Sequence, residues 1–155
     1  IEVFRSTGAR VGEIAEITME QVNLETGDIW IQGEKGGKYR TLYLDDDAKH
    51  YYKLYLETRT DSSPYMFPGS RRPYGKMCTC SFRNIMKTIG RRAGLTCRVY
   101  PHKMRKTLGM NLKNKGVDIG TIQEVLGHAS PAVTSQYYAQ STPHTLRSVR
   151  ERVSV

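Results

Sequence analysis

Cysteine is scarce in this sequence, and long apolar runs are missing. The chain has 155 residues and three cysteines, Cys78, Cys80 and Cys97. An odd, sparse set of this kind predicts no disulfide framework and favours a reducing, intracellular setting. No apolar run approaches the roughly 20 residues that cross a bilayer, and no signal-peptide pattern opens the chain. These absences argue against a secreted disulfide-rich scaffold and against a membrane partner.

Acidic residues are absent from one long stretch. No carboxylate lies between Asp61 and Asp118, whereas thirteen of the 24 Lys and Arg residues do. The rest of the chain holds the other eleven cations and all 15 acidic residues, so the net charge of +9 is concentrated in this span. A surface that faces phosphates explains such a span better than a merely solvated face. The expected partner is therefore nucleic acid.

The remaining composition is that of one folded domain. Charged residues make up 25% and hydrophobic residues 38% of the chain, which excludes a disordered tail. Alternating apolar residues predict two strands, 28–32 and 39–44, joined by a glycine-rich hairpin turn, 33–38. Apolar spacing of three and four predicts helices elsewhere, over residues 1–6, 9–17, 48–59, 81–93, 101–115, 118–126, 130–138 and 142–155. The sequence predicts an α+β, mainly helical domain with a small antiparallel sheet near its start.

Local signals refine three of these helices. The hydroxyl of Thr7 is expected to cap the helix over 9–17. The buried face of the helix over 48–59 is predicted on Tyr51, Leu54 and Tyr55. In the helix over 81–93 the corresponding face is predicted on Phe82, Ile85, Met86 and Ile89.

Five short pieces of the sequence carry residues suited to phosphate chemistry. They are Thr7-Gly8-Ala9-Arg10-Val11-Gly12-Glu13, the hairpin lysine Lys35, Pro101-His102-Lys103-Met104-Arg105, Leu126-Gly127-His128, and the pair Tyr137 and Tyr138. Each piece alone is weak, because a helix-surface Arg is usually solvated and a lone His is more often structural. Together and in this order they closely resemble the catalytic domain of the tyrosine recombinase (phage integrase) family. That domain carries T-G-x-R-x-x-E, a G-K-G-x-K-x-R-like turn, H-x-x-R, L-G-H and a Tyr nine residues later.

The resemblance spans residues 4 to 140 and implies a site-specific DNA recombinase or integrase. Such an enzyme cleaves and rejoins strands through a 3′-phosphotyrosine intermediate without ATP, metal or other cofactor, for integration or excision of a mobile element. It implies Tyr137 as nucleophile, His102 as proton acceptor and Lys35 as proton donor to the 5′-oxygen. Phosphoryl transfer needs positive groups at the non-bridging oxygens, and these are Arg10, Arg105 and His128. Glu13 is expected to orient Arg10 or His128 without touching phosphate.

Several alternatives stay open at this point. Glu34 is inserted before the hairpin lysine, so Lys38 competes with Lys35, and Tyr138 adjoins Tyr137. A type IB topoisomerase shares the chemistry, and a catalytically silent DNA-binding domain shares the charge. A zinc site is conceivable, on Cys78, Cys80, Cys97 and His102, although C-x-C is not the usual ligand spacing.

The resemblance also suggests how the protein assembles. Double-stranded DNA is the expected ligand, with Arg83, Lys87, Arg91 and Lys103 contacting its phosphates. Residues 142–155 are expected to form a tail helix that can dock on a neighbouring protomer of a DNA-bound tetramer. The chain opens on Ile1 without Met, so we expect a single catalytic domain, 1–155, of a longer bacterial, phage or mobile-element protein. That protein would be cytoplasmic and nucleoid-associated, with a separate core-binding domain.

Overall fold

The computed structural model describes residues 1–33 and 37–127, and the structural statements below refer to these residues. They form one short 3₁₀-helix, two strands and six α-helices. In chain order these are α1 (Glu2–Thr7), α2 (Val11–Glu16), η1 (Met19–Gln21), β1 (Asp28–Gly33), β2 (Gly37–Tyr43), α3 (Asp46–Glu57), α4 (Thr79–Arg92), α5 (Pro101–Asn114) and α6 (Ile119–Leu126). The mainly helical α+β organisation is confirmed.

The two strands form an antiparallel hairpin whose faces differ. Ile29 pairs with Leu42 and Ile31 pairs with Arg40, and the apolar members of these pairs are buried. Trp30, which pairs with Thr41, points to the opposite face and is exposed. Successive strand residues alternate between faces, so the sheet covers the core with one face only.

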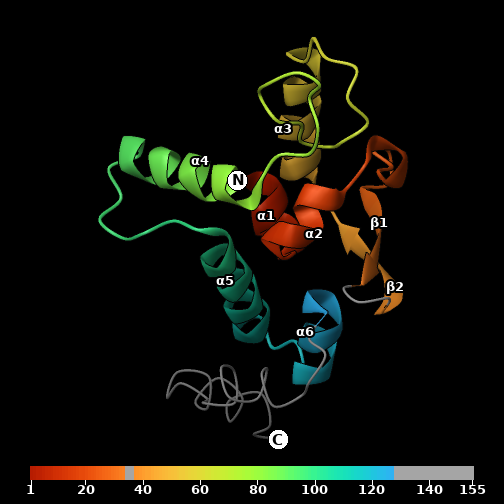
Figure 1. Cartoon of the computed structure of the whole chain (residues 1–155). Coiled ribbons are helices and arrows are strands. Elements are labelled where there is room, and N and C mark those ends of the chain that lie inside the picture. Colours follow the sequence, from red (N-terminus) through yellow and green to blue (C-terminus); the bar gives the residue numbers. More distant parts are fainter. Residues whose placement is uncertain (34–36, 128–155) are drawn as a thin grey trace, which may run out of the picture.

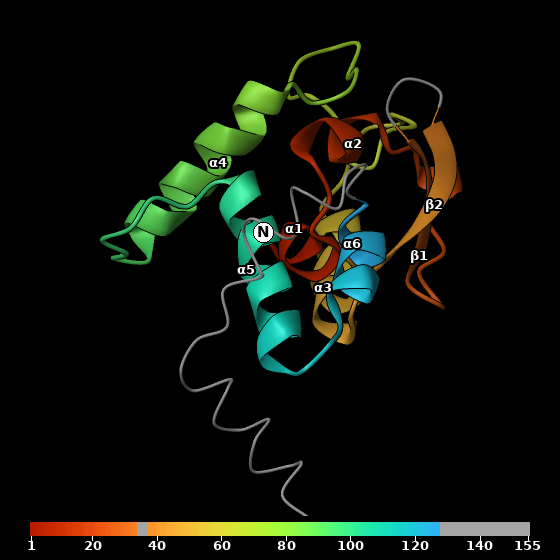
Figure 2. The same ribbon diagram turned by 90° about the horizontal axis from the view of Figure 1, so that it is seen from below.

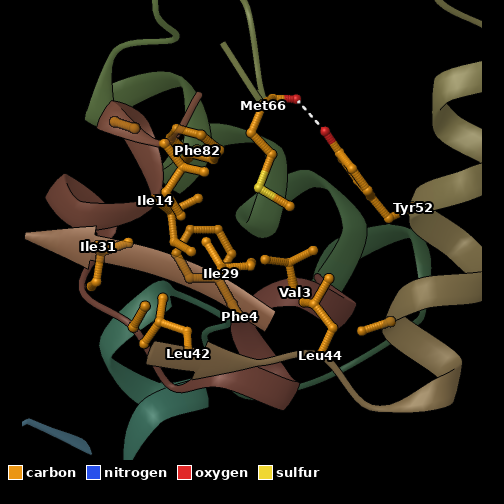
Figure 3. Close-up of a cluster of buried hydrophobic side chains, with 14 of the residues drawn as sticks. Val3, Phe4, Ile14, Ile29, Ile31, Leu42, Leu44, Tyr52, Met66 and Phe82 are labelled. Atoms are coloured by element: carbon orange, nitrogen blue, oxygen red, sulfur yellow. Dashed lines mark hydrogen bonds between the residues drawn. The ribbon is translucent and has the colours of Figure 1, made fainter. Parts of the chain in front are cut away.

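The main core lies between the hairpin and the helices α1, α2, α3 and α4 (Figure 3). The ring of Phe4 on α1 meets that of Phe82 on α4 edge to face, with centroids 5.5 Å apart. Tyr52 of α3 donates its hydroxyl to the carbonyl oxygen of Met66 at 3.1 Å. Burial raises the pKa of Tyr52, so this phenol is a protonated structural group.

The helices α1 and α2 stand in the middle of the molecule. The hairpin lies on one side of them and α4 on the other (Figures 1 and 2). The helix α5 packs on α1 and on α6. Gly8, between α1 and α2, has φ +59°, and a Cβ there would stand within 3 Å of the Leu108 and Leu126 side chains. This glycine lets α5 and α6 approach the junction of α1 and α2.

Two predicted buried faces are wrong in detail. On α3, Tyr51 is 57% exposed and Leu54 is also exposed, whereas Ala48 and Tyr52 are buried. On α4, Ile85 and Ile89 are exposed and the buried residues are Phe82, Met86 and Gly90. In both helices a small residue marks the inner face. Gly90 is such a residue, because a Cβ there would stand 2.7 Å from Val99 Cγ2.

Two further expectations need correction. Thr7 does not cap α2, because its hydroxyl donates to the Val3 carbonyl at 2.6 Å and accepts from Ala9 N. The sparse cysteines predicted no disulfide framework and a reducing setting, but the structure joins one pair, Cys78 and Cys80. Both lie at the start of α4, where their Cα atoms are 5.4 Å apart, within disulfide range. Cys97 is a free, exposed thiol.

Candidate active site

The junction of α1 and α2 presents the first arginine of the predicted site. Arg10 precedes the first residue of α2, and its backbone N–H donates to Glu13 Oε2 at 2.7 Å. Its Nη1 donates to Glu13 Oε1 at 3.1 Å, and its Nη2 donates to the Gly127 carbonyl at 3.2 Å. Glu13 is buried while the Arg10 side chain is 37% exposed. The carboxylate therefore fixes a guanidinium that still faces solvent.

The start of α5 presents the second arginine. Pro101 opens the helix, a position where its missing N–H costs no hydrogen bond. His102 and Arg105 follow at i and i+3, with His102 exposed and Arg105 only 4% exposed. Arg105 Nη1 donates to the Gly8 carbonyl at 2.6 Å, and its Nη2 donates to the Leu126 carbonyl. The buried guanidinium of Arg105 therefore ties the turn at Gly8 to the end of α6 at Leu126, next to Arg10.

These residues line one small pocket. A hollow of about 330 Å³ is bounded by Arg10, His102 and Arg105 together with Arg83 and Tyr100 from α4 and the loop before α5. Three arginines and a histidine thus meet at one surface. Positive groups fixed around a hollow suit an anion, because their orientation is set before the anion arrives. The site therefore has the chemistry of an anion-binding pocket.

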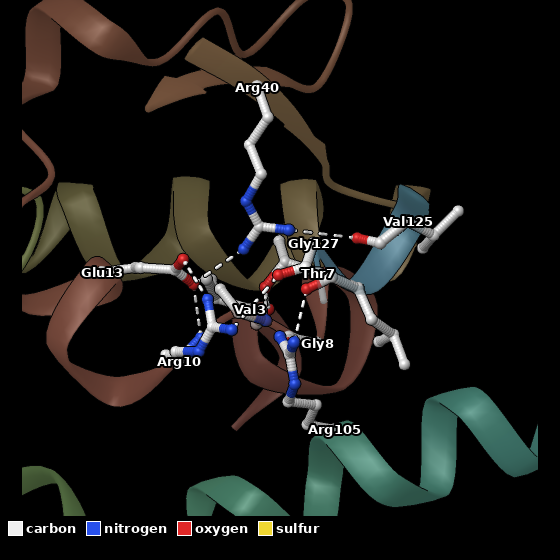
Figure 4. Close-up of polar contacts among 11 residues, drawn as sticks. Val3, Thr7, Gly8, Arg10, Glu13, Arg40, Arg105, Val125 and Gly127 are labelled. Atoms are coloured by element: carbon white, nitrogen blue, oxygen red, sulfur yellow. Dashed lines mark hydrogen bonds and ion pairs between the residues drawn. The ribbon is translucent and has the colours of Figure 1, made fainter. Parts of the chain in front are cut away.

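Beneath the pocket, one carboxylate serves two arginines (Figure 4). Glu13 Oε2, which accepts from Arg10 N, also accepts from Arg40 Nη2 at 2.8 Å. Arg40 comes from β2 and reaches across to the carbonyl of Val125 with its Nη1 at 3.3 Å. Arg10 and Arg40 therefore share a single acid, Glu13. The cluster keeps a net positive charge.

The pocket opens onto a larger basic groove. This groove of about 880 Å³ runs between α4 and the loop 94–100, and Arg83 and Tyr100 line both it and the pocket. Its predicted phosphate contacts are exposed and repeat every fourth residue on α4, at Arg83, Lys87 and Arg91. Lys103 lines an adjoining hollow with His102 and Lys106. The predicted DNA-binding residues are thus continuous with the predicted catalytic ones.

The structure brings together Arg10, Glu13, His102 and Arg105 as the sequence predicts. Lys35, His128 and Tyr137, and the alternative nucleophile Tyr138, lie outside the described residues, as does the tail 142–155. Lys38 belongs to β2. Their assignments remain predictions from the sequence.

One member of the site was missed by the sequence analysis. The family's hairpin motif ends in Arg, but the sequence alone assigns no role to Arg40. The signal lies in the alternation of β2, where Arg40 shares the inward face with Leu42. A charged residue in an inward position needs a buried partner, and Glu13 is that partner.

Metal ligands do not gather within the described ranges. No group of three or more His, Cys, Asp or Glu residues there could hold a metal ion. The zinc alternative on Cys78, Cys80, Cys97 and His102 therefore has no geometric support. In the same ranges, no helix combines the length and apolar character that crossing a membrane requires.

The fold and the pocket define a class, a mainly helical α+β domain with arginines gathered around a hollow that suits an anion. Comparison with known proteins assigns the family. Residues 1–145 match the phage integrase family. The chain belongs to this family, as its five sequence pieces indicated.

Individual relatives agree with this assignment. The chain is 39% identical over 150 residues to tyrosine recombinase XerA of Pyrococcus furiosus, and the match covers 96% of this chain and 51% of the relative. It is 30% identical to tyrosine recombinase XerC of Lactobacillus leichmannii, covering 97% and 52%. The chain therefore spans about half the length of the curated relatives that it matches.

Solved structures share the fold. A crystal structure of XerA recombinase superposes with a TM-score of 0.82 at 27% identity, covering 99% of this chain and 56% of the other. A Tn1549 transposon integrase in complex with transposon right end DNA gives a TM-score of 0.77 at 18% identity, covering 99% and 57%. The second likeness shows the fold alone.

Proposed function

We propose that this chain is the catalytic domain of a site-specific DNA recombinase that cleaves and rejoins strands through a 3′-phosphotyrosine. The observation that carries the proposal is the pocket in which Arg10, His102 and Arg105 meet. It gains support from the family match over residues 1–145. The biological role would be integration or excision of a mobile element.

In this mechanism the pocket holds the scissile phosphate. The exposed Arg10 fork pairs with non-bridging oxygens, since a guanidinium presents two parallel donors. Arg105 adds positive charge from the pocket wall, where its effect is strong because the surroundings exclude water. The in-line attack by Tyr137 forms the phosphotyrosine bond as the bond to the 5′-oxygen breaks.

Proton movements complete the step. A phenol has an unperturbed pKa of about 10, so Tyr137 needs a base, and His102 at the pocket rim takes its proton. Lys35 protonates the leaving 5′-oxygen, and His128 adds a donor to the phosphate. Rejoining is the same exchange in reverse with another 5′-hydroxyl, and the bond energy is kept in the enzyme–DNA link. No nucleotide cofactor is therefore required.

The experiment that tests this proposal traps the covalent adduct. Full-length protein is incubated with duplexes nicked inside a randomised region, because the short released strand then diffuses away and rejoining fails. Adducts are isolated on denaturing gels, and their DNA is amplified and tested again. We expect the enriched duplex to give a stable protein–DNA adduct.

Metal independence is the matching prediction. Because arginine and histidine donors stabilise the phosphate charge, the rate of adduct formation should be unchanged in excess EDTA. The measurement compares single-turnover rates on the enriched duplex with EDTA and with added Mg²⁺. A strict requirement for Mg²⁺ in the cleavage step would contradict the arginine mechanism.

The groove along α4 predicts a salt effect. Log affinity should fall with log salt concentration, and each phosphate contact should steepen that slope by about 0.9. Replacing Arg83, Lys87 or Arg91 by Ala should lower that slope by roughly one each, as measured by fluorescence anisotropy. Lys53→Ala, an exposed lysine of α3, is the control and should leave the slope unchanged. Equal slopes in all variants would remove the groove from the DNA interface.

We also propose that the protein works as a tetramer on double-stranded DNA in the cytoplasm. The apolar stripe of Leu146, Val149 and Val153 in the tail supports this, because a short amphipathic helix needs a surface to dock on. A neighbouring protomer would supply that surface.

A further inference from the structure

We propose that Arg40 is a positioning residue for strand cleavage, which keeps Arg10 both oriented and positively charged. The inference rests on the proposed function of the pocket. It concerns a residue that contacts neither the pocket hollow nor, in the mechanism above, the DNA. Arg40 acts through Glu13 and through the end of α6.

The first contact of Arg40 is a buried ion pair. Its Nη2 lies 2.8 Å from Glu13 Oε2, and the two side chains are 17% and 3% exposed. Glu13 also receives the backbone N–H and the Nη1 of Arg10. Three donors thus converge on one carboxylate, which Arg40 and Arg10 approach from opposite sides (Figure 4). Removing it would let the carboxylate rotate toward Arg10.

The second contact ties the hairpin to the end of α6. Arg40 Nη1 donates to the Val125 carbonyl at 3.3 Å, one of the last carbonyls of the helix. Gly127 follows with φ +63°, and a Cβ at this glycine would overlap the Arg40 guanidinium. The Gly127 carbonyl in turn accepts from Arg10 Nη2. Arg40 therefore packs against the turn that orients Arg10.

Besides orientation, charge explains why Arg10 and Arg40 share the carboxylate of Glu13. A carboxylate paired with Arg10 alone would neutralise it, and a neutral pair attracts phosphate weakly. Because Glu13 is shared with Arg40, the trio carries one net positive charge, located at the more exposed guanidinium of Arg10. Such a preset charge is what stabilises a developing phosphate charge.

The place of Arg40 in the chain extends this role. It lies on β2 five residues after Lys35, and its carbonyl partner Val125 lies three residues before His128. Arg40 therefore joins the two segments that lead to predicted catalytic residues. Through Glu13 of α2 it also reaches Arg10, which immediately precedes that helix. A shift of about 1 Å in such a support can cost on the order of 10²-fold in rate.

The test compares Arg40→Gln and Arg40→Lys in the full-length protein on the enriched nicked duplex. We expect Arg40→Gln to lower the single-turnover rate of adduct formation about 10²-fold while DNA affinity changes less than about threefold. Arg40→Lys keeps the charge, so its single-turnover rate should be at least about tenfold higher than that of Arg40→Gln. Thermal melting is recorded for every variant to show which of them fold. If Arg40→Gln does not fold, the cleavage rate of Arg40→Lys tests the positioning role instead.

A matched control comes from another arginine with the same kind of contacts. Arg59 pairs with Asp61 and donates to the carbonyls of Ser63 and Tyr65, away from the pocket. Arg59→Gln should leave the cleavage rate unchanged at the temperature of the assay. If Arg40→Gln cleaves as fast as Arg59→Gln, the positioning role of Arg40 is overturned.

A double variant separates charge sharing from simple support. Glu13→Gln in the Arg40→Gln background removes the acid that would neutralise Arg10, so the double variant should cleave faster than Arg40→Gln alone. A rate equal to or below that of Arg40→Gln would overturn the charge argument. Failure of the proposed function is distinguishable, because the wild type would then form no adduct that depends on Tyr137.

Discussion

Tyr137→Phe should abolish the covalent adduct and leave DNA binding intact. The substitution removes one oxygen, the atom that attacks phosphorus in the proposed mechanism, and leaves the ring and the basic groove unchanged. We expect no detectable adduct on the enriched duplex and a dissociation constant within about twofold of the wild type, an energy difference well below 1 kcal/mol. Denaturing gels measure the first quantity and fluorescence anisotropy the second.

Tyr138→Phe is the matched control for this result. It lies one residue later and should keep the adduct, because the family spacing counts nine residues from His128 to Tyr137. The opposite pattern, with the adduct lost only in Tyr138→Phe, would move the nucleophile to Tyr138. Adducts in both variants would contradict a tyrosine nucleophile at this position.

Arg105→Ala should destabilise the domain as well as stop cleavage. Arg105 is buried and donates to the carbonyls of Gly8 and Leu126. An unsatisfied buried acceptor costs about 1–3 kcal/mol, so losing the donors of both should cost about 2–6 kcal/mol. For a domain of this size the melting temperature should fall by roughly 10 °C.

Two comparisons check this second prediction. Arg92→Ala removes an exposed arginine at the end of α4 and should change the free energy of unfolding by less than about 0.5 kcal/mol. Arg105→Lys keeps the charge but cannot span both carbonyls with a fork, so it should recover only part of the stability. If Arg105→Ala has the same melting temperature as the wild type, the contacts of Arg105 with Gly8 and Leu126 contribute nothing to stability.

The hairpin and the pocket were predictable because their signals are local. Alternation from Ile29 to Ile31 predicts a strand, and the spacing of His102 and Arg105 places both on one face of α5. Arg10 follows Gly8, whose positive φ forms the turn between α1 and α2. These motifs describe short segments, and each segment folds as its pattern predicts.

The buried faces of α3 and α4 were less predictable. Both helices carry large apolar residues on more than one side, so size alone selects no inner face. The inner face is set by close approach, at Ala48 in α3 and at Gly90 beside Val99 in α4. A small residue is a weak signal in a sequence, although it decides which helix sides can meet.

The contacts of Arg40 and Arg105 depend on tertiary structure. Arg105 reaches the Gly8 carbonyl across 97 positions, and Arg40 reaches the Val125 carbonyl across 85. No spacing rule foresees which backbone carbonyl a guanidinium will find at such separation. The sequence therefore predicted that Arg10, His102 and Arg105 meet, and the structure revealed what orients the two arginines.

The most direct test of the account is to find the residue that carries the DNA. The trapped adduct is digested with nuclease and trypsin, and the peptide that bears a nucleotide is sequenced by mass spectrometry. We predict a 3′-phosphoryl nucleotide on Tyr137, formed equally well in EDTA. A nucleotide on any residue other than Tyr137 or Tyr138, or none in the adduct fraction, would contradict the phosphotyrosine mechanism.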